Sequence, residues 1–197
     1  MIKPRNLAVL MQRLADLIST ARHDPTRHTC FVSYHDADFS EVESFIRQFG
    51  EEFVPRCIGV TPQDRFVGSL DEHYIKSRVR DECLGDSTVT IVLLGRETWH
   101  QMFVDWEIAA SLLEGPDRPR NGILAMPLPS MGNRATLPER IRDNFSGPGD
   151  EKSPVIYESY PTTRESFRAK LDRAHASRSQ PGAAVNNARP LRRADSP

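Results

Sequence analysis

Short apolar runs alternate with amphipathic stretches along this chain. The clearest run is VTIVLL, residues 89–94, whose unbroken aliphatic and β-branched side chains predict a strand buried on both faces. Similar runs predict four more strands, at residues 29–34, 56–60, 122–128 and 154–159. Strands that are buried on both faces are typical of parallel sheets.

Helical periodicity fills the intervals between these runs. Apolar residues recur every three or four positions over residues 39–49, over about 71–83 and around Glu107, and shorter patterns lie at 137–144 and after Thr163. Strands that alternate with helices require right-handed crossovers onto a parallel sheet. The predicted fold class is therefore α/β, a flavodoxin-like doubly wound parallel sheet of about five strands with helices on both faces.

The chain of 197 residues is long enough for one domain with extensions. Leucines at helical spacing predict an amphipathic N-terminal helix within residues 1–25, which is also a candidate contact between copies of the chain. Residues 26–175 are expected to form the α/β domain. Residues 176–197 are rich in small residues, proline and arginine and lack aromatics, which predicts a disordered basic tail.

Composition excludes several partners. The formal net charge of -1 gives no global basic field, so neither nucleic acid nor an anionic membrane is expected. No apolar run is long enough to span a bilayer. The three cysteines lack zinc-binding spacing, so we expect no metal and reduced thiols in a cytoplasmic protein.

Polar side chains gather where two predicted strands end. Ser33, Tyr34, Asp36 and Asp38 follow the first strand, and Glu107 lies in the first turns of the helix after the strand at 89–94. Ligands of open α/β sheets bind at the carboxyl ends of the strands, so these side chains are expected to face one crevice. The simpler alternative is that Glu107 complements a helix dipole and that the two aspartates cap the next helix.

Several well-known sites are missing from this sequence. No GxGxxG follows the first strand and no GxxxxGK[ST] occurs, which argues against the dinucleotide and P-loop fingerprints. The third strand ends in LLGRET and the fifth in IYESYP, so the phosphoacceptor aspartate and the lysine of a receiver domain are absent. HDADF is also a poor match to the phosphate loop of a flavodoxin.

Four segments in order, CFVSYHDAD, DEHYIKSRVRDE, STVTIVLLGRETW and FVDWEIAAS, resemble TIR-like domains of the MTH538 type, including the Thoeris antiphage TIR subunit. The resemblance is clearest over residues 29–113 and weaker to about residue 174. It implies NAD-consuming chemistry in which Glu107, within its tryptophan-glutamate context, is the catalytic residue. The resemblance and the position on helices and loops together give the expected substrate-binding residues Ser33, Tyr34, Asp36, Asp71, Tyr74, Arg96, Thr98, Trp99, Phe103 and Trp106.

The implied chemistry suits these residue types. Breaking the nicotinamide N-glycosidic bond develops oxocarbenium character on the ribose, which a carboxylate stabilises or captures. Aromatic faces exclude water, and an arginine such as Arg96 suits the pyrophosphate. NAD+ is then a substrate, and no cofactor is expected.

The product stays open at this stage. Attack by the adenosine part of the same molecule gives a cyclic ADP-ribose isomer, and attack by water gives ADP-ribose. The leading hypothesis is a homo-oligomeric enzyme of antiphage defence that makes a cyclic ADP-ribose-type signal for a separate effector protein. The alternatives are a non-catalytic TIR interaction module and an N-deoxyribosyltransferase-like nucleoside enzyme.

Overall fold

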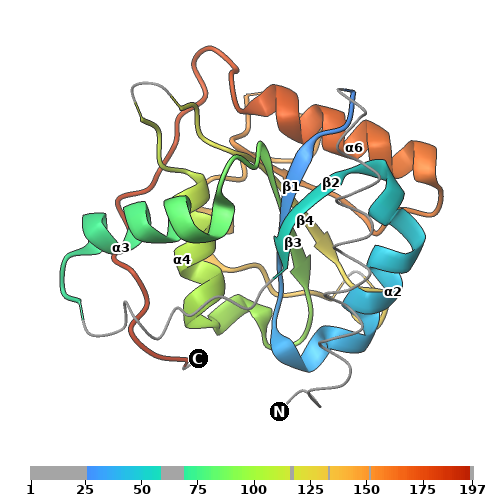
Figure 1. The fold of residues 1–197 in the computed structure, drawn as a ribbon, viewed down its shortest axis with the longest axis horizontal. Coiled ribbons are helices and arrows are strands. Elements are labelled where there is room, and N and C mark those ends of the chain that lie inside the picture. The colour runs from blue at the N-terminus through green and yellow to red at the C-terminus, as the bar shows by residue number, and fades with distance from the viewer. Residues whose placement is uncertain (1–25, 59–68, 116–117, 133, 151, 196–197) are drawn as a thin grey trace.

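A five-stranded parallel sheet forms the centre of the molecule (Figure 1). The computed structural model describes residues 26–58, 69–115, 118–132, 134–150 and 152–195, so the predicted N-terminal helix lies outside the described residues. The strands stand in the order β2-β1-β3-β4-β5, which confirms the flavodoxin-like α/β fold. Their bounds are β1 Thr29–Ser33, β2 Val54–Ile58, β3 Val89–Leu94, β4 Gly122–Pro127 and β5 Val155–Tyr157.

Helices cover both faces of this sheet. Figure 1 shows α2 and α6 on one side and α3 and α4 on the other. The α-helices are α2 Phe39–Phe49, α3 Glu72–Val79, α4 Met102–Ser111, α5 Glu139–Arg142 and α6 Arg164–Ser177. Shorter helical turns are the 3-10 helices Asp36–Asp38, Gly50–Glu52 and Thr98–His100, and the π-helix Arg80–Leu84 that continues α3.

Each sheet face has its own apolar core. Alternate residues of β1 and β3 pack against the aromatic side chains of α2 and α6, among them Phe45 and Phe167. The intervening residues face α3 and α4, where Phe31 packs near Ile75 and Trp106. All six residues of β3 are buried, which accounts for the unbroken apolar run in the sequence.

The strand order reverses between β1 and β3, which are paired in parallel with Ser33 opposite Val92. The chain leaves these two strands toward opposite faces of the sheet, toward α2 after β1 and toward α4 after β3. Such a switch point leaves a crevice at the carboxyl ends of the strands. The predicted polar residues of the first strand and of the Glu107 helix therefore meet at one edge.

Several predicted elements differ from the structure in their bounds, and two of these differences have a structural reason. The strand predicted at 56–60 begins earlier, at Val54, and it includes Pro55. β2 is the edge strand next to β1, and proline is tolerated on a sheet edge because the missing N–H faces away from the partner strand. The helix predicted to Cys83 changes at Arg80 from α-helical to π-helical geometry.

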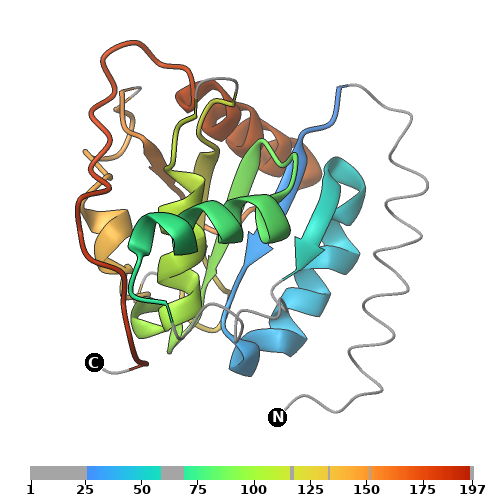
Figure 2. The same cartoon turned by 60° about the vertical axis from the view of Figure 1, so that its left-hand side comes forward.

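The C-terminal segment differs from the predicted disordered tail. Helix α6 continues to Ser177, and the following residues run past α5 toward the beginnings of α3 and α4 (Figure 2). Leu191 is only 3% exposed. Composition predicted disorder because the segment is poor in apolar residues, but its arginines pair with acidic residues of distant elements. The domain boundaries themselves stay a prediction.

In the described part of the chain, no helix combines the length and the apolar character needed to cross a bilayer.

Candidate functional site

Glu107 lies on the second turn of α4 with its side chain against the end of β1. Glu107 is 2% exposed. The hydroxyl group of the wholly buried Ser33 donates a hydrogen bond to Glu107 Oε2, with 2.6 Å between the two oxygens. The two residues are 74 positions apart, so only the sheet topology brings them together. This contact confirms that the two predicted groups meet at the carboxyl edge of the sheet.

A chain of buried polar side chains also fixes the backbone at Glu107. Ser111 donates to the Glu107 carbonyl oxygen over 2.7 Å, and its hydroxyl lies 2.6 Å from Thr90 Oγ1 on β3. Asn121 donates to Thr90 Oγ1 over 3.1 Å. Buried polar networks whose members are hydrogen-bonded hold one defined arrangement. The carboxylate is therefore positioned through its side chain and through its helix.

The loop after β3 is joined to the turn after β1. Thr98, which is wholly buried, accepts a hydrogen bond from Gly95 N at 2.9 Å and lies 3.5 Å from Asp38 Oδ2. A β-carbon added at Gly95 would stand 1.9 Å from Asp38 Oδ2, so glycine is needed for this close approach. The GxxT sequence, residues 95–98, therefore joins the loop after β3 to the turn after β1 beside the site. The contact of Gly95 and Thr98 with Asp38 is here called the latch.

Asp38 is a partly buried carboxyl group in this latch. Burial raises the pKa of Asp38 above its ordinary value, and the neighbouring His35 acts in the opposite direction. The sequence pattern indicated either a side chain that faces the crevice or a helix cap, and the Asp38 side chain makes no cap hydrogen bond to α2. Its contact with Thr98 was missed because nothing local in the sequence marks it.

The predicted aromatic residues occupy different environments. Tyr34 is 4% exposed, while Trp99 is half-buried with its ring edge-on to His100 at 4.6 Å. Trp106 is wholly buried, and its indole nitrogen donates to the Arg192 carbonyl oxygen at 2.8 Å. Phe103 lies edge-on to Trp106 at 5.7 Å. Trp106 and Phe103 therefore pack in the cluster beneath the C-terminal segment.

The remaining predicted residues are exposed. Asp36 and Arg96 stand on the turns after β1 and β3, so both lie at the same edge as Ser33. Asp71 caps α3 by accepting from Tyr74 N at 3.0 Å, which gives it a structural function in the DxxY pattern. Tyr74 is 47% exposed on α3. The substrate-binding roles of these residues stay predictions.

Other features of the described residues lie away from Glu107. A cavity of about 360 Å³ lies beside the edge strand β5, and none of its lining residues belongs to the predicted set. The described part of the chain contains no group of three or more histidine, cysteine, aspartate or glutamate residues placed to hold a metal ion.

The chain has the strand order, the crevice between β1 and β3 and the buried glutamate on α4 that define a TIR-like domain of the flavodoxin-like α/β class. The model of the family described as Thoeris protein ThsB, TIR-like domain, matches residues 31–133, which is more than half of the chain. The chain belongs to this family, and the membership supports a role in Thoeris defence. No curated protein matches the chain.

Proposed function

We propose that this protein is an NAD+-consuming enzyme that cleaves the nicotinamide N-glycosidic bond and makes a cyclic ADP-ribose-type product. The observation that carries the proposal is the buried Glu107 carboxylate, oriented by Ser33 at the carboxyl edge of the sheet. A carboxyl group at the carboxyl edge of a parallel sheet lies where ligands of this fold class bind, which favours a chemical role. Membership of the ThsB family supports the same assignment.

The proposed reaction separates charge at the ribose. The bonding electrons leave with nicotinamide, which departs as a neutral base, and positive charge develops on the ribose ring. Glu107 stabilises that charge or captures the anomeric carbon covalently, as carboxylates do in glycoside hydrolysis. The hydrogen bond from Ser33 fixes the orientation of the carboxylate through Oε2.

The acceptor determines the product. In the proposed cyclisation, an atom of the adenosine part of the same molecule forms the new bond to the anomeric carbon, and no water is consumed. Exclusion of water from the site favours this outcome over hydrolysis. Tyr34 and Trp99 are the proposed aromatic walls, and Arg96 is the proposed pyrophosphate contact, because all three lie on the turns at this edge.

A cyclic nucleotide product suits a signalling role in defence. The proposal includes a separate effector protein that responds to the product and a homo-oligomer of this chain. NAD+ is the substrate in this scheme, so no resident cofactor is required.

The test is incubation of the full chain with NAD+, followed by chromatography and mass measurement of all products. We expect one nicotinamide for each new molecule, and that molecule is lighter than ADP-ribose by one water. Parallel incubations with deoxynucleosides test the nucleoside-enzyme alternative. ADP-ribose alone would overturn the cyclisation, and free base from a deoxynucleoside with NAD+ intact would overturn the substrate assignment.

A further inference from the structure

Residues 186–195, here called the strap, lie as an extended segment across α5, α4 and α3 (Figure 2). The strap follows α6 in the chain but rests against the opposite face of the sheet. It forms no helix or strand of its own. The groove that holds it is built by side chains of Glu72, Asp105, Trp106, Glu139, Arg140 and Asp143.

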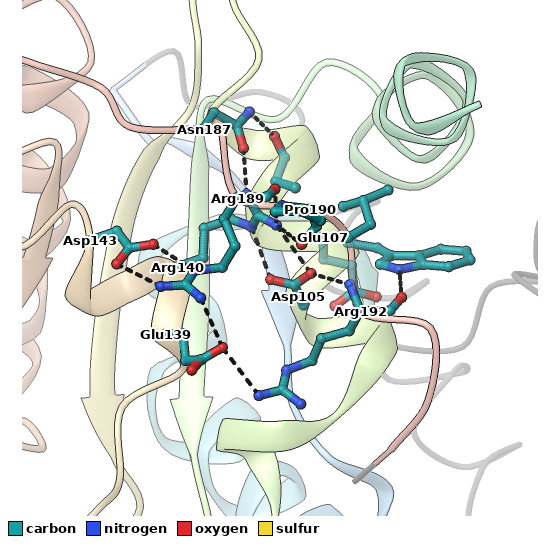
Figure 3. A network of polar contacts seen from close by, with 12 residues as sticks. Asp105, Glu107, Glu139, Arg140, Asp143, Asn187, Arg189, Pro190 and Arg192 are labelled. Carbon is teal, nitrogen blue, oxygen red and sulfur yellow. Dashed lines mark hydrogen bonds and ion pairs between the residues drawn. The ribbon is translucent and has the colours of Figure 1, made fainter. Parts of the chain in front are cut away.

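Side chains of this groove bond to the main chain of the strap. Buried or partly buried donors and acceptors meet the successive main-chain groups of residues 189–192 (Figure 3). The bonds are Arg140 Nη2 to the carbonyl oxygens of Arg189 (3.0 Å) and Pro190 (3.2 Å), Leu191 N to Glu72 Oε1 (3.1 Å), Arg192 N to Asp105 Oδ2 (3.0 Å), and Trp106 Nε1 to the Arg192 carbonyl oxygen (2.8 Å). Main-chain recognition of an extended segment is the way in which peptide-binding domains gain affinity.

One apolar side chain anchors the strap. Leu191 is buried among residues of α3 and α4, including Ile75, Met102 and Trp106. Burial of this leucine removes apolar surface from water and so favours the bound strap. A pocket for one side chain between main-chain bonds gives such a groove its sequence preference.

Opposite charges flank this anchor. Arg189 pairs with Asp143 at 2.7 Å and with Glu139 at 3.2 Å, and Arg192 Nη2 lies 3.5 Å from Glu139. The Arg189 guanidinium lowers the pKa of Asp143, which shows that the pair favours the charged forms. The groove is therefore complementary to a basic segment.

The centre of the groove is held in place by the domain. Arg140 is wholly buried, and its guanidinium pairs with both oxygens of Asp105 at 2.9 and 3.2 Å. Both residues come from α-helices of the domain, and Figure 3 shows the pair facing the strap. Such a pair presents fixed donors and acceptors to an incoming main chain, which reduces the entropic cost of binding.

The link between α6 and the strap is held by local bonds. The backbone N–H groups of Ser179, Gln180 and Ala183 each donate to the carbonyl oxygen of the residue three positions earlier. Most side chains from 179 to 185 are exposed. Departure of the strap therefore changes little within residues 179–185. The bonds that it breaks are those to the groove and those that Asn186, Asn187, Arg193 and Asp195 make to neighbouring segments.

We propose that the groove formed by α3, α4 and α5 is a peptide-docking site for an extended basic segment with one buried aliphatic side chain. The occupant in this structure is the protein's own Arg-Pro-Leu-Arg-Arg segment, residues 189–193, which acts as a tethered ligand. The inference rests on the contacts of the strap and does not depend on the NAD+ chemistry.

The test uses a fluorescent peptide with the sequence of residues 186–195, added to the full chain. The tethered segment competes at an effective concentration in the millimolar range, so the parent binds the peptide weakly. The variant Leu191→Asp weakens the tether and leaves the groove intact, and we expect it to bind the peptide at least about tenfold more tightly than the parent. A peptide carrying aspartate in place of the leucine is the matched control and is expected not to bind.

A second full-chain variant, Arg189→Glu, weakens the tether by repulsion from Asp143 and Glu139 without burying a charge in the apolar pocket. Circular dichroism establishes that each variant is folded. Equal binding of the peptide to the parent and to both variants would overturn the proposal, because the peptide would then bind elsewhere. Absence of binding to a folded variant would overturn it as well.

Discussion

Gly95 shows how one residue fixes the geometry beside Glu107. Its substitution by alanine places a β-carbon 1.9 Å from Asp38 Oδ2, so the Asp38 side chain has to leave Thr98. We expect Gly95→Ala to lower the free energy of unfolding by about 1–3 kcal/mol, the usual cost of overpacking. Urea denaturation of the parent and the variant measures this change.

The same experiment has a matched control in Gly115→Ala. A β-carbon there meets its nearest neighbour, the Arg118 carbonyl oxygen, at 3.8 Å, so we expect a change within about 0.5 kcal/mol. Asp38→Ala is expected to relieve part of the cost of Gly95→Ala, because the two residues are in contact. Fully additive effects of the two substitutions on the free energy of unfolding would show that Gly95 and Asp38 are not in contact.

His175 makes the stability of the domain depend on pH, and the lowered pKa of its ring sets the direction of that dependence. Burial lowers the pKa of His175 from 6.5, and His28, stacked on it at 4.2 Å, and Arg178 lower it further, while Asp172 opposes them. The folded state thus favours the neutral ring, and its contribution to stability is present above pH 6.5 and is lost as the pH falls. We expect the melting temperature to fall between about pH 7.5 and about pH 5.5.

The variant His175→Phe isolates this contribution, because it keeps a ring beside His28 and cannot take up a proton. We expect its melting temperature to fall less than that of the parent over the same pH interval. Identical pH profiles for the two proteins would show that another group is responsible.

At the scale of elements, the short helix α5 is held to α4 by one buried ion pair. Arg140→Met leaves Asp105 buried without its guanidinium partner, so we expect a loss of about 3–5 kcal/mol in the free energy of unfolding. Arg142→Met on the same helix is the control. The side chain of Arg142 is 59% exposed, and its loss is expected to cost no more than about 0.5 kcal/mol.

Chemical denaturation of both variants measures this difference. The additional substitution Asp105→Leu in the Arg140→Met background is expected to recover part of the loss, since it removes the unpaired charge. Equal stability of Arg140→Met and Arg142→Met would contradict the account of the pair.

The elements differ in how well the sequence predicts them. The bounds of β3 were predicted correctly, because a strand buried on both faces leaves an unbroken apolar run. β2 begins two residues before its prediction, since Pro55 is acceptable only on an edge strand and strand order is not a local property. The π-helical turn at Arg80 was missed for a similar reason. It lets the Arg80 guanidinium reach the Ala110 and Pro119 carbonyl oxygens of distant segments.

In the whole molecule, contacts between residues far apart in the sequence can be predicted only where the topology of the sheet brings those residues together. The meeting of Ser33 with Glu107 followed from the rule that parallel strands end at one edge. The packing of Trp106 against the strap did not, because the strap forms no helix or strand whose place relative to the sheet could be inferred. The strap itself was predicted as disordered, because composition cannot show that Glu139 and Asp143, at α5, pair with Arg189.

Glu107 is the residue that we propose to perform the chemistry on NAD+. The most direct test of this claim is nicotinamide release from NAD+ by three purified full chains, namely the parent, Glu107→Gln and Glu114→Gln. Glutamine keeps the shape of the side chain and removes its charge, while Glu114 is an exposed acid just beyond the end of α4. We expect release to fall at least about a hundredfold in Glu107→Gln, the order of magnitude for loss of one charge-stabilising group, and to be unchanged in Glu114→Gln. Equal release by all three proteins would contradict the claim.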